Sequence, residues 1–128
     1  MVYNILLAED NQDDIFLTKL ALKEKGIRAN IIEANNGETV LKLINQFKKD
    51  KKQCPDLIIM DINLPVINGL EVLKEIKLNG INIPVIILTS SDSKDDKRFC
   101  IENGAKLFFK KPNNIHELED IISLVFSF

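Results

Sequence analysis

Two uninterrupted apolar runs constrain the fold of this chain more than any other feature. Residues 57–60 read Leu-Ile-Ile-Met and residues 85–88 read Val-Ile-Ile-Leu, with no polar residue in either run. A strand covered on one face alternates apolar and polar residues, whereas a short continuous run rich in Ile is typical of a strand covered on both faces. Both runs therefore predict central strands of a parallel sheet with helices on each side.

The rest of the chain alternates between shorter apolar runs and segments with helical periodicity. Further strands are expected at residues 5–8, 31–32 and 107–109. Between the strands, apolar residues recur at helical spacing, and those of the third and fifth helices are expected to face inward. These residues are Phe16, Leu17, Leu20 and Ala21 in the first helix, Val40, Leu43, Ile44 and Phe47 in the second, Leu70, Leu73 and Ile76 in the third, Phe99 and Ile101 in the fourth, and Leu118, Ile121, Ile122 and Val125 in the fifth. Five strands alternating with five helices predict an α/β fold with a doubly wound parallel sheet and right-handed crossovers.

Polar residues indicate where several helices begin. Asn11 to Asp14 supply an N-cap and first-turn acids, which favour a helix start through hydrogen bonding and the helix macrodipole. Ser93 and Asn114 are expected to start the fourth and fifth helices, each with an acidic residue three positions later.

Length and composition predict one soluble domain. The 128 residues are 45% hydrophobic and 28% charged, as in ordinary globular proteins. The net charge of -2 gives no electrostatic reason to expect nucleic-acid binding, and no apolar run approaches the ~18 residues of a membrane span. Cys54 and Cys100 form no CxxC pair and the N-terminus does not resemble a signal peptide, so a cytoplasmic protein with reduced thiols is expected. We expect a single domain over residues 1–128, with no output domain after Phe128.

Chemically active side chains follow four of the predicted strands. Glu9 and Asp10 follow the first strand, Asp61 the third, Thr89 the fourth and Lys111 the fifth. The carboxyl ends of parallel strands meet at one edge of the sheet, where ligands bind. Three neighbouring carboxylates repel one another, and this repulsion is costly unless a cation occupies the site. All-oxygen ligands suit Mg²⁺, and zinc is disfavoured because the site has neither thiol nor imidazole.

Asp61 is a candidate nucleophile at this edge. A carboxylate can attack phosphorus to form an aspartyl-phosphate, and phosphoryl transfer mainly needs positioning and charge neutralisation. Each residue also has an ordinary structural explanation, for example Asp61 as a turn residue, Thr89 as a strand end and Lys111 as a solvated lysine. Suitable side chains at four matching strand ends favour the functional interpretation. On composition alone, Lys110 is an alternative to Lys111.

Four short motifs surround these side chains. They are Leu6-Leu7-Ala8-Glu9-Asp10, Met60-Asp61-Ile62-Asn63-Leu64-Pro65 with Gly69 after it, Leu88-Thr89-Ser90, and Gly104-Ala105 continuing to Lys111-Pro112. As a set they resemble the receiver domain of bacterial two-component response regulators, over essentially all 128 residues. The long connection from Phe47 to Pro55 is similar to that of stand-alone receivers that serve phytochrome-type kinases. The resemblance implies a flavodoxin-like sheet with strand order 2-1-3-4-5.

The resemblance also implies a metal site. In the family, the counterpart of Asp10 binds Mg²⁺ directly, and the counterpart of Glu9 acts on the metal through water. Asp61 and the backbone carbonyl of Asn63 would complete the set of ligands.

By the same resemblance, Asp61 is the phosphoacceptor for a phosphohistidine of a histidine kinase or phosphotransfer protein. Thr89 would hydrogen-bond the phosphoryl group, and Lys111 would pair with Asp61 or with its phosphate. Because the family places this lysine directly before a proline, the resemblance selects Lys111 over Lys110. It also suggests a cis bond between Lys111 and Pro112.

The resemblance further implies how phosphorylation becomes a signal. Thr89 would move toward the phosphoryl group, and Phe108, which stands where the family often has tyrosine, would fill the vacated space. A surface near the fourth helix, fifth strand and fifth helix would then bind an unidentified downstream protein. Asn63 and Ser91 would border the path of an attacking water, and neither is a strong base, so slow self-dephosphorylation is expected.

The C-terminal end carries the apolar residues Val125, Phe126 and Phe128. They either pack back onto the domain or form a homodimer contact.

Other functions remain open from the sequence. A phosphatase that turns over an aspartyl-phosphate generally needs a second acid or base two residues after the nucleophile, where Asn63 cannot serve. A receiver-like fold used for binding alone is a second alternative. A nucleotide- or flavin-binding module is disfavoured because this sequence has no phosphate-binding glycine loop. A Ser-His-Asp hydrolase is disfavoured because His116, the one histidine, lies at the expected start of the last helix, away from the acidic edge. We therefore expect a signalling domain and not a turnover enzyme.

Overall fold

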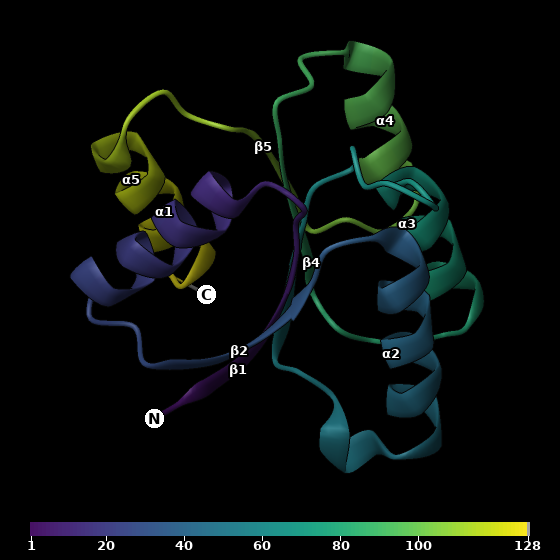
Figure 1. Cartoon of the computed structure of the whole chain (residues 1–128). Helices are drawn as coiled ribbons and strands as arrows, with labels where there is room; N and C mark the ends of the chain where they lie inside the picture. Colours follow the sequence, from purple (N-terminus) through teal and green to yellow (C-terminus); the bar gives the residue numbers. More distant parts are fainter. Residues whose placement is uncertain (128) are drawn as a thin grey trace.

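The computed structural model describes residues 1–127 and confirms the alternation of strands and helices. The strands are β1 (Tyr3–Ala8), β2 (Ala29–Ala34), β3 (Leu57–Met60), β4 (Val85–Thr89) and β5 (Leu107–Lys110), and the helices are α1 (Gln12–Glu24), α2 (Gly37–Lys49), α3 (Gly69–Leu78), α4 (Lys94–Glu102) and α5 (Ile115–Val125), with a short 3-10 helix, η1 (Lys51–Gln53), after α2. All strand pairs are parallel and the order is β2-β1-β3-β4-β5, as expected. Figure 1 shows the three layers, with α1 and α5 on one side of the sheet and α2, α3 and α4 on the other.

The two central apolar runs are buried on both faces, as their composition predicts. Successive strand residues point to opposite faces of a sheet. Accordingly, Ile58 and Ile87 pack in a cluster with α2, α3 and α4, whereas Ile59 and Ile86 pack in a second cluster with α1 and α5. Burying a side chain of this size contributes about 1.5–3 kcal/mol. The sheet therefore forms a rigid base for the residues that follow its strands.

Every α-helix begins at an N-cap side chain that accepts a hydrogen bond from the backbone N–H three residues later. The five N-caps are Asn11, Asn36, Asn68, Ser93 and Asn114. Such a side chain satisfies one of the N–H groups that the first helical turn leaves unpaired. The predicted starts of the first, fourth and fifth helices are confirmed.

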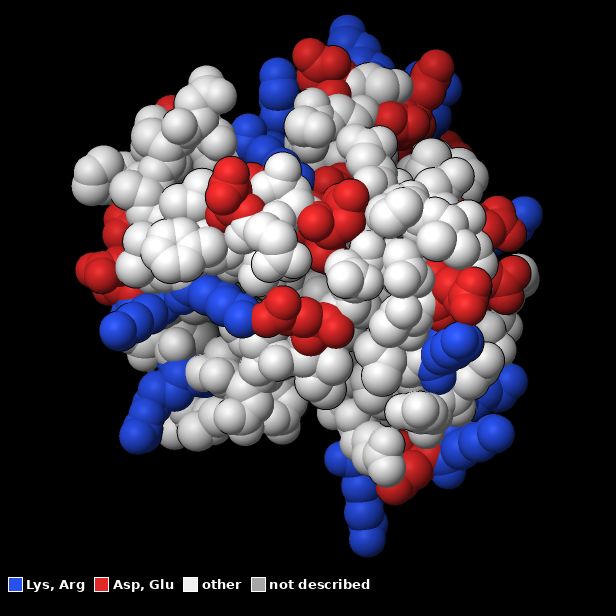
Figure 2. Space-filling view, in the orientation of Figure 1, with Lys and Arg blue, Asp and Glu red and all other residues white. Residues whose placement is uncertain are grey.

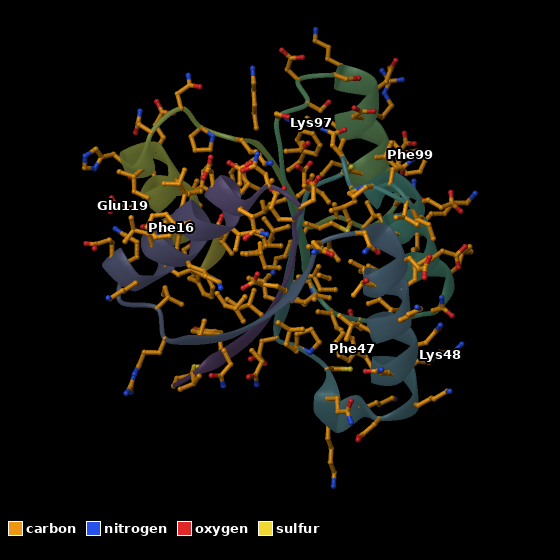
Figure 3. The ribbon with its side chains drawn as sticks, viewed as in Figure 1. Phe16, Phe47, Lys48, Lys97, Phe99 and Glu119 are labelled. Carbon is orange, nitrogen blue, oxygen red and sulfur yellow. The ribbon has the colours of Figure 1, made fainter. Side chains whose placement is uncertain are left out.

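Helical spacing alone does not distinguish the buried from the exposed apolar residues in two helices. Phe16 is 64% and Leu17 38% exposed, because α1 turns Ile15 toward the sheet instead. In α4, Ile101 is 47% exposed and the neighbouring Cys100 is fully buried. Successive residues are about 100° apart around a helix, so adjacent apolar residues leave the rotation of the helix undecided. In α2 the prediction is right: Phe47 faces the sheet and Lys48 points away from it (Figure 3).

The C-terminal helix ends against the start of the chain. Val125 is buried, and the ring of Phe126 packs edge-to-face on Tyr3 with ring centroids 4.8 Å apart. Packing back onto the domain is therefore confirmed for these two residues, and Phe128 lies outside the described residues. No helix within residues 1–127 is long and apolar enough to cross a membrane.

The prediction of a cis bond between Lys111 and Pro112 is wrong, because residues 1–127 contain no cis peptide bond. The trans isomer is the intrinsically favoured one for a bond before proline. The Lys111 N–H also donates to the carbonyl oxygen of Thr89 at 2.7 Å, which continues the β4–β5 pairing up to the proline.

Two glycines hold the loop between β3 and α3 close to its neighbours. A Cβ at Gly37 would lie 1.7 Å from the carbonyl oxygen of Ile67, and a Cβ at Gly69 would lie 2.6 Å from the carbonyl oxygen of Asp61. The Gly37 N–H also donates to the carbonyl oxygen of Pro65 at 3.1 Å. Backbone packing of this kind fixes the loop that directly follows Asp61.

We predict that Gly37→Ala lowers the free energy of unfolding by about 2–3 kcal/mol, because backbone atoms of the loop would have to move away from the new Cβ. Urea denaturation followed by circular dichroism measures the change. Glu38→Ala, at an exposed position of the same turn, is the control and should change stability by less than about 0.5 kcal/mol. Equal effects of the two substitutions would contradict the steric account.

Candidate functional site

The carboxyl ends of four strands bring the predicted site residues together. Glu9 and Asp10 follow β1, Asp61 follows β3, Thr89 ends β4 and Lys111 follows β5. The Lys111 ammonium lies 2.7 Å from Oε1 of Glu9 and 2.8 Å from Oδ2 of Asp61. In the view of Figure 2, acidic side chains gather near the middle of the molecular surface, where the chain passes from β1 toward α1 in Figure 1.

Lys111 is at the centre of the site and contacts one further acid, which was not among the predicted site residues. Its Nζ also lies 2.7 Å from Oδ2 of Asp14, in the first turn of α1. An ammonium group has three N–H donors, so each of the three carboxylates can accept one of them. The Lys111 side chain is 16% exposed, and those of Glu9 and Asp61 are 6% and 4% exposed. These ion pairs are therefore much less screened by water than surface pairs.

Burial and hydrogen bonding shift the ionisation of this cluster. Burial by itself lowers the pKa of Lys111, but hydrogen bonds to Asp14, Asp61 and Glu9 outweigh it and raise that pKa above its ordinary value. The ammonium therefore stays charged. Burial raises the pKa of Glu9, although hydrogen bonds from Lys111 and from the Asn11 backbone N–H oppose the shift. The single positive charge of Lys111 thus compensates part of the negative charge of three carboxylates, in a site that is partly shielded from water.

The choice of Lys111 over Lys110 agrees with the geometry. The Lys110 ammonium lies 3.5 Å from Oδ2 of Asp92, and both side chains are largely exposed. Adjacent residues of an extended chain point to opposite sides, so only one of two neighbouring lysines can reach the acids.

Both carboxylate oxygens of Asp61 have hydrogen-bond partners. Oδ2 accepts from Lys111, and Oδ1 accepts from the backbone N–H of Asn63 at 3.0 Å. The Asp61 N–H in turn donates to the carbonyl oxygen of Ala8 at 3.0 Å, which ties the residue to β1. The carboxylate is therefore fixed by the sheet on one side and by its own loop on the other.

The acidic residues fit a divalent cation with oxygen ligands. Glu9, Asp10 and Asp61 each offer a carboxylate oxygen, and these oxygens all lie within 4.8 Å of one another. The carboxylate of Asp10 is exposed and has no hydrogen bond or ion pair with any other residue in 1–127. Hard cations such as Mg²⁺, Mn²⁺ and Ca²⁺ prefer such donors. The use of the Asn63 carbonyl as a further ligand stays a prediction.

Thr89 is fully buried beside this cluster. Its Oγ1 accepts hydrogen bonds from the side-chain amide of Asn63 at 3.4 Å and from the Ser91 N–H at 3.3 Å. The Ser91 hydroxyl donates to Oδ2 of Asp96 at 2.6 Å, so it is bonded to the first turn of α4. Phe108, on β5, is half-buried against the apolar cluster under α2, α3 and α4. The roles of Ser91 in dephosphorylation and of Phe108 as a switch stay predictions.

His116 lies apart from the acidic edge. Its side chain is 88% exposed, and Nδ1 lies 3.5 Å from Oε2 of Glu119 on the same helix. This placement gives no support to a hydrolase that uses a serine and a histidine.

Sequence comparison relates most of the chain to one family. The profile of the response regulator receiver domain matches residues 5–123. Response regulator Rcp1 of Synechocystis sp. is 33% identical over 127 residues, which cover 97% of this chain and 86% of that protein. The alkaline phosphatase synthesis transcriptional regulatory protein PhoP of Bacillus subtilis is 32% identical over 114 residues, which cover 89% of this chain. The chain spans 44% of the length of PhoP and 45% of that of the similar regulator SphR of Synechococcus elongatus.

Solved structures show the same architecture. The phosphorylated cyanobacterial phytochrome response regulator RcpA superposes with a TM-score of 0.85 at 30% identity, over 98% of this chain and 91% of that one. The Mn²⁺-bound form of response regulator Rcp1 also gives a TM-score of 0.85, at 31% identity, over 98% of this chain and 95% of that one.

We predict that Lys111→Met lowers the free energy of unfolding by about 3 kcal/mol in metal-free buffer, because two buried carboxylates lose their cation. Added Mg²⁺ or Mn²⁺ should restore stability to the variant more than it stabilises the unchanged protein, since a bound metal supplies the missing charge. Urea denaturation with and without metal measures both effects. Lys110→Met, at the exposed pair, should change stability by less than about 0.5 kcal/mol. A metal response that is the same in all three proteins would contradict a shared site for lysine and metal.

Proposed function

Because this chain belongs to the response regulator receiver domain family, we propose that Asp61 is its phosphoacceptor and takes a phosphoryl group from the phosphohistidine of a histidine kinase or phosphotransfer protein. The observation that carries the proposal is the environment of Asp61. Its carboxylate is 4% exposed, lies against an ammonium, and shares a cluster of oxygens with Glu9 and Asp10. Such a site suits a reaction that needs a positioned carboxylate and neutralised negative charge.

In the proposed step, an oxygen of Asp61 bonds to phosphorus while the phosphorus–nitrogen bond of the phosphohistidine breaks. The imidazole leaves with the electron pair of that bond. When bound, Mg²⁺ would neutralise charge on the carboxylates and on the phosphoryl oxygens. Asp10 and Asp61 are suited to hold it, with Glu9 near enough to act through water. Lys111 supplies a second positive charge, and the Thr89 hydroxyl is available as a hydrogen-bond donor to a phosphoryl oxygen.

We expect this chain to act once on each phosphoryl group and not as a turnover enzyme. The residue two positions after the nucleophile is Asn63, whose amide cannot act as a general acid or base. Slow self-dephosphorylation follows from that lack of a base.

The partners are proposed from the family. The likeness to RcpA, described as a phytochrome response regulator, makes a phytochrome-type histidine kinase the candidate donor. The output would be a shift of the surface formed by α4, β5 and α5 toward a downstream protein, in the cytoplasm. Allosteric couplings of this kind are typically worth about 1–3 kcal/mol.

Incubation with acetyl phosphate, with and without Mg²⁺, followed by intact mass spectrometry tests the proposal. We expect one Mg²⁺-dependent phosphoryl adduct on the unchanged protein, formed as acetate leaves, and none on Asp61→Asn. No adduct in the unchanged protein would leave a receiver fold used for binding alone. Rapid release of phosphate without a lasting adduct would favour a phosphatase.

A second prediction concerns the switch. On phosphorylation, the Thr89 side chain should move toward the phosphoryl group and the half-buried Phe108 ring should rotate inward. A pair of crystal structures, with and without a stable phosphoryl analogue, measures both movements. An unchanged ring would show that Phe108 does not transmit the signal.

A further inference from the structure

Asp14 differs from the other acids that bind Lys111. Glu9 and Asp61 belong to the group of carboxylates that can share a metal ion, whereas Asp14 does not. Its Oδ2 nevertheless lies 2.7 Å from the Lys111 ammonium, as close as Oε1 of Glu9. The contact joins the first turn of α1 to the end of β5, across 97 residues of sequence.

The two ends of this contact are held by the backbone. The Asp14 N–H donates to the N-cap oxygen of Asn11 at 3.0 Å, which fixes the first turn of α1. The Lys111 N–H donates to the carbonyl oxygen of Thr89 at 2.7 Å, which fixes the base of the lysine. Of the two side chains between them, that of Lys111 is the longer and has the greater freedom to adopt other rotamers.

A metal ion would change the partners of Lys111. A divalent cation held by Asp10 and Asp61, with Glu9 acting on it through water, would compete with the ammonium for the carboxylates of Glu9 and Asp61. Two of the three N–H donors of Lys111 would then be released, and the one to Asp14 would remain. Those two released donors are the ones that can bind oxygens of an incoming phosphoryl group.

We propose, resting on the function proposed above, that Asp14 is a positioning residue that holds the Lys111 ammonium beside Asp61 during phosphoryl transfer. Without this anchor, the long lysine side chain must be ordered in the transition state itself, which costs conformational entropy. Asp14 is 32% exposed and Lys111 16%, so the anchor is partly shielded from water.

A matched control is available on the same helical turn. Asp13 carries the same charge at an exposed neighbouring position, and its carboxylate has no hydrogen bond or ion pair with any other described residue. Asp13→Asn therefore repeats the charge change of Asp14→Asn without touching Lys111. Asp14→Glu keeps a carboxylate at the anchoring position.

The test is the rate of phosphorylation by acetyl phosphate at saturating Mg²⁺, measured by intact mass. We expect Asp14→Asn to be about 5- to 10-fold slower than the unchanged protein, from the loss of one charged hydrogen bond to Lys111. Asp13→Asn should retain the full rate, and Asp14→Glu should recover most of the loss. In a Lys111→Met background, Asp14→Asn should have no further effect, because Asp14 is proposed to act through the lysine.

The outcomes separate the two proposals. If the unchanged protein forms the adduct but Asp14→Asn and Asp13→Asn react at equal rates, the positioning role is overturned and the phosphoacceptor role stands. If Asp14→Asn slows the reaction equally in the Lys111→Met background, Asp14 does not act through Lys111. If the unchanged protein forms no adduct, the proposed function fails, and the positioning role fails with it.

Discussion

The site depends on one electrostatic constraint, which is the gathering of acidic side chains around a single ammonium group. Glu9, Asp14 and Asp61 all lie within 2.8 Å of Lys111, and two of the three are nearly inaccessible to water. Carboxylates so close together are unfavourable unless positive charge compensates them. In the absence of metal, Lys111 supplies that charge. A divalent cation and the Lys111 ammonium can therefore each compensate the negative charge of these carboxylates. In the reaction proposed for Asp61, both positive charges are present.

The fold supplies the positions that this constraint requires. A parallel sheet places the carboxyl ends of β1, β3, β4 and β5 at one edge. Helices pack on both faces of this sheet and bury the central strands (Figure 1). The loop after Asp61 is held by the close approaches at Gly37 and Gly69. The helix after Asp10 begins at Asn11, and this start brings Asp14 to the lysine. The functional atoms are thus placed by backbone contacts.

Much of this arrangement follows from local sequence. Continuous apolar runs predict the central strands, and the rule that parallel strands end at one edge predicts that Glu9, Asp61 and Lys111 lie together. Asp14 was not predicted to belong to the site, because an acid in a first helical turn already has a sufficient explanation in the helix macrodipole. Its position four residues after Asp10, at the start of a helix that leaves the acidic edge, is the signal that could have indicated it.

Other features could not be read from local sequence because they depend on tertiary contacts. The rotation of α1 about its axis, which exposes Phe16 and buries Ile15, is decided by packing against the sheet. The bond before Pro112 is a different case, because its trans isomer is the one that local preference favours and the cis isomer is implied only by the family resemblance. The strand order, in contrast, was predicted from that same resemblance and is confirmed.

The most direct test of the central claim is a crystal structure of the protein with Mg²⁺ and beryllium trifluoride, a mimic of the phosphoryl group. We expect the trifluoride on a carboxylate oxygen of Asp61, the metal at Asp10 and Asp61, and the Lys111 ammonium in contact with a fluorine atom. A trifluoride on another residue would contradict the assignment of Asp61. A metal bound elsewhere, with Lys111 still paired to Glu9, would show that lysine and metal do not share the site.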